Sequence, residues 1–212
     1  MATFTARGQY WLMTAKVLLI ACGALAHELA QLVRLNQWTH VRIRCLPPGL
    51  HNQPGKIPKA VRAQIEKSRG KYERIFVAYG DCGTGGKLDE VLSEYGIERL
   101  PGAHCYEFFA GSTVFKSLAE AEAGTFYLTN FLVRHFDRLV RKGLGLDVRP
   151  ELKDLYFGNY RRLVFLAQDV NPELRELAEA HARFLGLEYQ YHFTGIAHVE
   201  ERLKDEIVRW QE

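Results

Sequence analysis

Apolar runs that end at glycine or at polar residues recur along this chain of 212 residues. Uninterrupted apolar runs bounded by turn residues are typical of strands that are buried on both faces. Three such runs directly follow the basic residues Lys16, Arg74 and Arg162, with which the predicted strands begin, and weaker strand candidates lie at 41–46, 97–100, 125–129 and 187–192. We therefore predict a strand at each of these places.

Segments with apolar residues three or four positions apart follow most of these runs. This spacing is typical of amphipathic helices, and it predicts helices at 24–36, 57–72, 87–95, 131–142, 172–185 and 199–210. Alternating strands and helices favour parallel pairing, because parallel strands need a crossover connection. We predict an α/β fold with largely parallel sheets, helices on both faces and two or three similar Rossmann-like lobes around a central seam.

The domain organisation follows from the same pattern. Residues 16–212 contain no long spacer, so we expect one compact α/β unit with a lobe boundary near 101–124. Residues 1–15 are polar and aromatic, and we expect a poorly ordered N-terminal extension. They lack the apolar core of a secretion signal, which favours a cytoplasmic protein whose four cysteines are free thiols or metal ligands.

Charge and hydropathy exclude two classes of partner. The chain has 28 basic and 25 acidic residues, and no basic block marks a nucleic-acid surface. The most apolar stretch, residues 17–35, contains Gly23, His27 and Glu28, which a lipid-spanning helix would not tolerate. We therefore expect neither nucleic acid nor a membrane as a partner, and small polar molecules remain candidates.

Three cysteines are candidate metal ligands. Cys22 and Cys82 each close a predicted strand, and Cys105 follows a Pro-Gly turn at the end of a third. His51 lies in a loop stiffened by prolines, and it is the nearest imidazole candidate together with His104. Thiolates favour zinc or an iron–sulfur cluster, and an added imidazole is more typical of zinc. The alternative is that the cysteines are small buried hydrophobic residues.

Two further groups of residues are candidates for binding and catalysis. Backbone N–H groups of the glycine-rich turn could hold an anion, although such turns are also common without ligands. The turn contains Gly83, Thr84, Gly85 and Gly86. Carboxyl and imidazole groups act as acid or base when burial moves their pKa towards neutrality. The candidates for that role are Asp81, His104 and Glu107.

Several short motifs together resemble a bacterial and archaeal family known as a domain of unknown function. The family is often encoded near corrinoid-dependent methyltransferases for methylated amines. The matching stretches are residues 21–25, 50–54, 79–83, 103–106, 111–112 and 124–129. The resemblance implies cysteines at positions 22, 82 and 105, a histidine at position 51, and a place in one-carbon or methylated-amine metabolism.

Two functions are consistent with these observations. The first is a metal-dependent enzyme that acts on a small polar or methylated substrate, with zinc or an iron–sulfur cluster at the strand ends. The second is a non-catalytic accessory protein that handles a metal or a corrinoid for a methyltransferase partner. Candidate ligands on rigid strand ends favour the enzyme.

Overall fold

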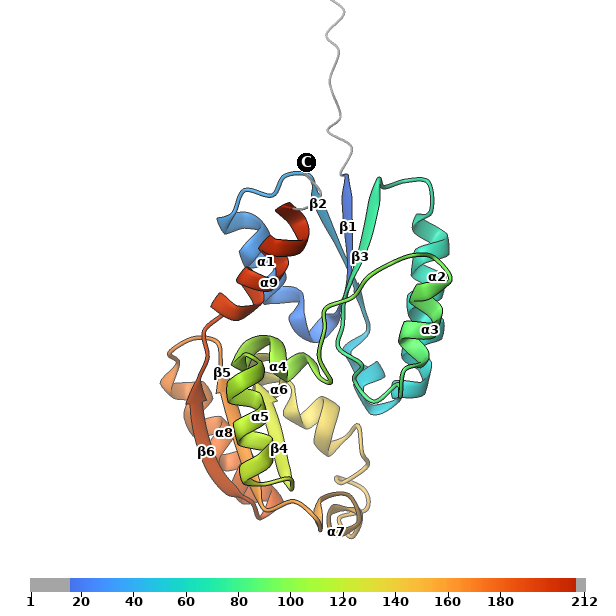
Figure 1. Cartoon of the computed structure of the whole chain (residues 1–212). Helices are drawn as coiled ribbons and strands as arrows, with labels where there is room; N and C mark the ends of the chain where they lie inside the picture. Colours follow the sequence, from blue (N-terminus) through green and yellow to red (C-terminus); the bar gives the residue numbers. More distant parts are fainter. Residues whose placement is uncertain (1–15, 209–212) are drawn as a thin grey trace, which may run out of the picture.

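Two parallel sheets of three strands each form the framework of the protein in the computed structural model, which describes residues 16–208 (Figure 1). The strand order is β2-β1-β3 in the first sheet and β4-β5-β6 in the second. The strands are β1 (Val17–Cys22), β2 (Val41–Leu46), β3 (Arg74–Ala78), β4 (Thr125–Thr129), β5 (Arg162–Ala167) and β6 (Glu188–Phe193). The predicted α/β fold with largely parallel sheets is therefore confirmed.

Helices cover both faces of each sheet, so each sheet and its helices form one lobe. In Figure 1, α1 and α9 lie on one side of the first sheet, and α2 and α3 lie on the other. The α-helices are α1 (Ala26–Leu35), α2 (Ile57–Ser68), α3 (Lys87–Ser93), α4 (Cys105–Ala110), α5 (Ser112–Ala121), α6 (Asn130–Arg134), α7 (Leu152–Phe157), α8 (Pro172–Leu185) and α9 (Ala197–Val208). Shorter turns are η1 (Gly23–Leu25), η2 (Pro48–Asn52), η3 (Pro54–Lys56) and the π-helical η4 (Asp137–Arg141).

The central strand of each sheet is the most apolar part of its lobe. Every residue of β1 is buried, as expected for a central parallel strand with helices on both faces. In β5 the side chains alternate between two faces. Phe165 packs with the helices α6 and α8, whereas Val164 and Leu166 pack with α4 and α5. These two strands hold the carboxyl ends of both sheets in fixed positions.

The carboxyl ends of the two sheets face each other. Figure 1 shows β1 running down towards the second lobe and β4 running up towards the first. Helix α4 lies in the seam: Phe108 and Phe109 belong to the first core, and Ala110 belongs to the second. Ligands of open parallel sheets bind at the carboxyl ends of strands, so the seam is where a functional site is expected.

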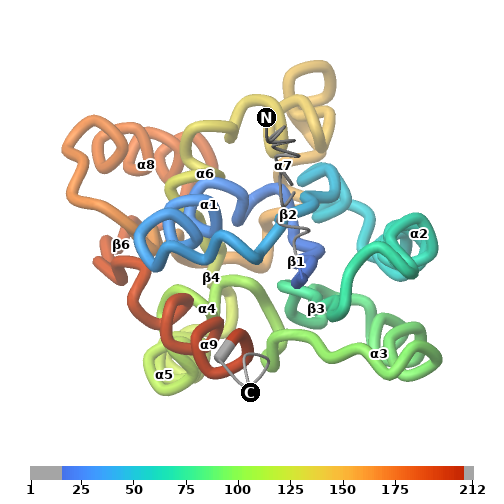
Figure 2. The backbone as a smooth tube through the Cα atoms, turned by 90° about the horizontal axis from the view of Figure 1, so that it is seen from above, coloured from blue at the N-terminus to red at the C-terminus, as the bar shows by residue number. Residues whose placement is uncertain are grey.

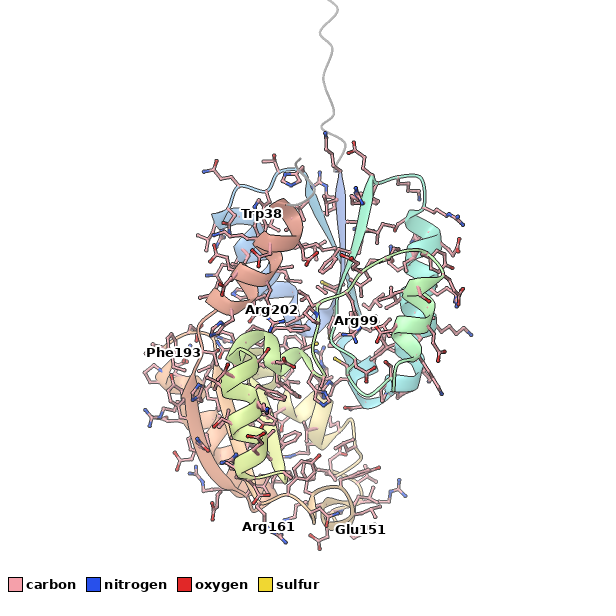
Figure 3. All side chains as sticks on the ribbon, viewed as in Figure 1. Trp38, Arg99, Glu151, Arg161, Phe193 and Arg202 are labelled. Atoms are coloured by element: carbon pink, nitrogen blue, oxygen red, sulfur yellow. The ribbon has the colours of Figure 1, made fainter. Side chains whose placement is uncertain are left out.

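The last helix returns the chain to the first lobe. Strand β6 ends the second sheet, and α9 then places Val199, Leu203 and Ile207 in the core of the first lobe. Helices α9 and α4 lie side by side in Figures 1 and 2 and contact each other. Arg202 of α9, labelled in Figure 3, donates hydrogen bonds to Ser112 and Pro101. The two lobes are therefore connected by two chain crossings and by packed side chains.

Some predicted elements differ from the structure. Residues 97–100 form a single bridge from Arg99 to Val77 and no strand. The helix predicted at 131–142 is divided into α6 and the π-helical turn η4, and the helix predicted at 57–72 ends at Ser68. Cys105 opens the helix α4 and does not end a strand, and Cys82 lies four residues beyond the end of β3. The predicted extension 1–15 and the end of the last helix lie outside the described residues.

Between residues 16 and 208, no helix combines the length and the apolar character needed to cross a bilayer. The apolar stretch 17–35 is divided into β1, η1 and α1, with a 3-10 turn at Gly23. An added Cβ at Gly23 would lie 2.8 Å from the carbonyl oxygen of Leu46, so this turn packs closely against the end of β2.

Candidate functional site

A small cavity of about 30 Å³ lies in the seam between the two sheets. Its lining comes from both lobes, with Cys22 at the end of β1, Tyr79 directly after β3 and Thr129 at the end of β4. The other polar or sulfur-containing side chains of the lining are Cys82, Cys105, His51, His104 and Tyr106. A cavity of this size holds one or two water molecules or a single metal ion.

The structure brings all three candidate thiol ligands to one cavity, whose lining also includes His51. The thiols of Cys22, Cys82 and Cys105 all belong to the lining of this cavity. The Sγ atoms of Cys82 and Cys105 lie 3.3 Å apart and share a hydrogen bond. Cys45 is exposed on β2 and does not belong to the lining.

Close backbone packing holds this thiol pair together. The N–H groups of Asp81 and Cys82 donate to the carbonyl oxygens of Gly102 and Ala103, at 3.0 and 2.8 Å. An added Cβ at Gly80 would lie 3.0 to 3.1 Å from three backbone atoms of His104. Glycine at position 80 therefore allows the two loops to approach closely enough for their thiols to meet.

The backbone at Cys82 is strained. Its φ is +49°, in the left-handed region that residues with a Cβ rarely adopt. Such strain is common at binding and catalytic positions, where the surrounding structure must enforce it. Arg99, labelled in Figure 3, supports the adjoining loop by pairing with Asp89 and donating to the carbonyl oxygen of Gly102.

The three thiols differ in their acidity. The hydrogen bond from Cys105 lowers the pKa of Cys82, and this effect outweighs the burial that opposes it. The same bond and the burial of the sulfur raise the pKa of Cys105 well above its ordinary value. Burial raises the pKa of Cys22 to about 11. Cys82 is therefore the thiol that most readily becomes a thiolate.

Two tyrosines and two histidines surround the thiols. Tyr79 is 1% exposed, and its hydroxyl has no partner at hydrogen-bond geometry, although the Cys22 thiol lies close enough to influence its pKa. The Tyr106 hydroxyl and His51 Nε2 lie 3.3 Å apart. Burial of the ring, followed by the charge of His104, lowers the pKa of His51. The neutral imidazole is the form that binds metal ions.

Asp81 and the glycine-rich turn form a closed structure of their own. The Asp81 carboxylate accepts from the Thr84 hydroxyl at 2.7 Å and from the N–H groups of Gly85 and Gly86 at 3.1 and 2.9 Å. These bonds, that from Thr84 first, lower the pKa of Asp81 to about 2. Asp81 does not belong to the cavity lining. In this structure its carboxylate occupies two of the N–H groups that the predicted anion cradle needs, so the predicted roles of Asp81 and of residues 83–86 stay predictions.

Glu107 and His104 take different positions around helix α4. Glu107 accepts from the Ala103 N–H at 3.2 Å and from the Ser112 hydroxyl at 2.6 Å, outside the cavity lining. It therefore fixes the loop that carries Cys105. His104 belongs to the cavity lining and lies 6.2 Å from Tyr106, measured between ring centroids. Of the three acid–base candidates, only His104 lines the cavity.

A comparison with protein families identifies the family of this chain. The model of a family described as protein of unknown function (DUF1638) matches residues 45–203. The chain belongs to this family. The match includes His51, Cys82 and Cys105, whereas Cys22 precedes its first residue. No curated protein and no solved structure matches the chain.

The cysteines of this cavity and His51 are residue types that bind metal ions through thiolates and an imidazole. Three thiolates and one imidazole form a common zinc site, and thiolates also hold iron–sulfur clusters. Two thiolates on one zinc ion lie about 3.8 Å apart, close to the 3.3 Å between Cys82 and Cys105. Among residues 16–208, no group of three or more Cys, His, Asp or Glu side chains is already arranged to hold a metal ion. Cys22 and His51 would therefore have to turn towards the pair.

We expect oxidation to link the thiol pair. Diamide, which accepts two electrons and two protons, should join Cys82 and Cys105 in the reduced, metal-free protein, because their sulfurs are already 3.3 Å apart. Peptide mapping by mass spectrometry should show one disulfide and leave Cys45 alkylated. The Cys105→Ser variant should not form this bond. A dominant bond between Cys22 and Cys82 would contradict the geometry of the pair.

Sequence reasoning overlooked part of the site. Tyr79 and Tyr106 line the cavity, but tyrosines in apolar segments are usually packed in the core. The signal for Tyr79 was its place between a buried strand and a glycine turn. Thr129 ends a predicted strand, but no signal in the sequence shows that Thr129 and Leu132 reach this cavity, because they come from the other lobe.

Proposed function

We propose that the protein is a metal-dependent enzyme with a thiolate metal site in the seam between its two sheets. Cys22, Cys82 and Cys105 would bind the metal, with His51 as fourth ligand or close neighbour. The observation that carries this proposal is the meeting of three thiols in one cavity, from three separate segments of the chain. Open parallel sheets bind their ligands at this edge.

The size of the cavity favours a single ion over a cluster. About 30 Å³ is enough for one ion, whereas an iron–sulfur cluster with several irons and sulfides would displace the surrounding side chains. The donor set of three thiolates and one imidazole is typical of zinc. We therefore propose zinc as the metal and keep an iron–sulfur cluster as the competing outcome of the experiment below.

The residues around the thiols have distinct proposed roles. A zinc ion held by the three thiolates, with His51 as a neighbour, would keep one coordination position open and would supply Lewis acidity there towards a water, a thiol or a nitrogen of the substrate. Tyr106 would orient the His51 ring through the contact at Nε2. The buried hydroxyl of Tyr79 has no partner of its own, so it would donate to a group bound among the thiols. His104, on the cavity lining, would transfer protons.

The proposed substrate is a small polar molecule of one-carbon or methylated-amine metabolism. The small size of the cavity supports a substrate that presents only a small reactive group to the thiols. The methylated-amine part of this proposal rests on the resemblance of the sequence motifs alone. The match to the family of unknown function describes no reaction.

Metal content tests this proposal directly. Protein purified without oxygen should contain about one zinc per chain by elemental analysis and should be colourless. A brown protein with broad visible absorption would instead identify an iron–sulfur cluster. Cys82→Ser should lose most of the metal, because a serine hydroxyl is a poor substitute for a thiolate.

The exposed thiol of Cys45 provides a matched control. Cys45→Ser removes a thiol from β2 outside the cavity, and it should retain the metal of the parent protein. The proposal fails if the anaerobically purified parent contains no metal. It also fails if the Cys82→Ser protein is folded and contains as much metal as the Cys45→Ser protein.

A further inference from the structure

A second, larger pocket of about 490 Å³ opens beside the thiol cavity. It lies between α1, α6 and the turn after β5, and its volume is within the usual range for small-molecule sites. Gly23 and Asn130 line it, and they directly follow Cys22 and Thr129 of the thiol cavity. The thiol cavity and the second pocket therefore adjoin the same two turns, which follow β1 and β4.

Glu28 is an unusual residue in the lining of this pocket. It is 3% exposed, and its Oε2 atom is buried without a hydrogen-bond partner. It lies on α1 next to Leu29, in the buried part of the helix. Leaving a buried carboxylate oxygen unpaired is costly. An apolar side chain at position 28 would satisfy the packing of α1. The presence of Glu28 therefore points to a ligand whose hydrogen-bond donor pairs with Oε2.

The charged groups that act on Glu28 line the same pocket. Burial raises its pKa, a hydrogen bond from its own backbone opposes this, and the charges of His27, Asp169 and Arg134 have smaller effects in that order. All three of these residues line the same pocket. Glu28 therefore belongs to a pocket whose lining carries charged groups of both signs.

A hydrogen-bond network fixes the opposite side of the pocket. The Asn130 side chain donates to Asp169 at 2.8 Å, and its oxygen accepts from the backbone N–H of Gln168 at 3.2 Å. The Gln168 side chain in turn accepts from the backbone N–H of Asn130 at 2.8 Å. Asn130 and Gln168 are both buried. Asp169 is thus held in place at the pocket before any ligand binds.

We propose that this pocket binds a small molecule with a protonated amino group, which contacts Glu28 and Asp169, and an anionic group, which contacts Arg134. Two carboxylates and one guanidinium group favour a cation at one end and an anion at the other. Binding would give Glu28 the donor that it lacks. This proposal does not rest on the metal site, although a ligand here would lie next to the thiols.

Three probes of similar length test the proposal. Isothermal titration calorimetry of the full chain should detect saturable binding of 4-aminobutyrate and of butylamine, and no binding of butyrate. Glu28→Gln should weaken both amines about tenfold or more, because it removes a charge-assisted hydrogen bond. Arg134→Gln should weaken only 4-aminobutyrate. Glu151→Gln, at the far end of the second lobe in Figure 3, should change nothing.

A stability measurement separates binding from a structural role of Glu28. Glu28→Met replaces the unpaired carboxylate with an apolar side chain of similar size, so its melting temperature should rise. The proposal is overturned if neither amine binds, or if Glu28→Gln binds the amines as tightly as Glu151→Gln. A fall in the melting temperature of Glu28→Met would show that Glu28 stabilises the fold, which also contradicts the proposal.

The same titrations distinguish this inference from the metal proposal. The Cys82→Ser protein should still bind 4-aminobutyrate, because Cys82 does not line the second pocket. Parent protein that was purified without oxygen, binds the amines and contains no metal would refute the metal site alone. A metal-containing protein that binds neither amine would refute the amine pocket alone.

Discussion

Replacing Phe165 with alanine should lower the free energy of unfolding by about 3–5 kcal/mol. Phe165 is 1% exposed at the centre of the second sheet and packs edge-to-face on Tyr191, with ring centroids 5.8 Å apart. The lost side chain would leave a cavity between β5 and the helices α6 and α8, which rigid packing cannot close. The melting temperature should fall by about 6–20 °C. Urea unfolding followed by circular dichroism would measure the change.

Phe193 provides the matched control for this substitution. It lies on the neighbouring strand β6 but is 53% exposed, on the outer edge of the second lobe (Figure 3). Its replacement with alanine should change the stability by less than about 0.5 kcal/mol. Equal losses for the two variants would show that Phe165 does not belong to a packed core.

The Phe165→Ala protein also tests whether the lobes unfold together. Helix α9 connects the end of the second sheet to the core of the first lobe, and α4 contributes side chains to both. We expect a single unfolding transition that shifts as a whole. Two separate transitions would show that the second lobe unfolds independently.

The framework could be predicted because its central strands, β1 and β5, are buried on both faces. The six buried residues of β1 and the apolar run of β5 have few alternatives to central parallel strands. The convergence of Cys22 with the turn after β3 follows from the parallel pairing of β1 and β3. The apolar pattern and the parallel topology were therefore sufficient to predict that Cys22 lies near the turn after β3.

The elements around the seam could not be predicted in the same way. The residues of α4 form a short apolar run that fits a strand or a helix equally well. Cys105 was placed after the Pro-Gly turn that ends the predicted strand at 97–100, whereas it is the first residue of this helix. It reaches Cys82 because Gly80 lets the loop after β3 approach the residues before α4.

The second pocket depends on contacts between distant parts of the sequence. Glu28 comes from the first lobe, and Asn130 and Asp169 come from the second. Periodicity reports which face of an element is buried, but not which residues of another lobe it meets. The available signal was a carboxylate in the buried part of α1, next to Leu29. A buried polar residue without a partner becomes informative only when its surroundings are known.

Replacing Gly80 with alanine should separate the thiols of Cys82 and Cys105 while the protein still folds. The new Cβ would lie 3.0 to 3.1 Å from backbone atoms of His104, so the loop before α4 must move away. This movement would lengthen the hydrogen bonds from Asp81 and Cys82 to that loop and separate Cys82 from Cys105. Overpacking of this kind destabilises by about 1–3 kcal/mol.

Metal content and disulfide formation would report the damage to the site. The Gly80→Ala protein should retain less metal than the parent and should form the Cys82–Cys105 disulfide more slowly with diamide, because the two sulfurs start further apart. Gly55→Ala is the matched control, since an added Cβ at Gly55 meets no atom within 4 Å. That variant should match the parent in both assays. If the Gly80→Ala protein also matches the parent in both, the close approach at His104 does not position the thiols.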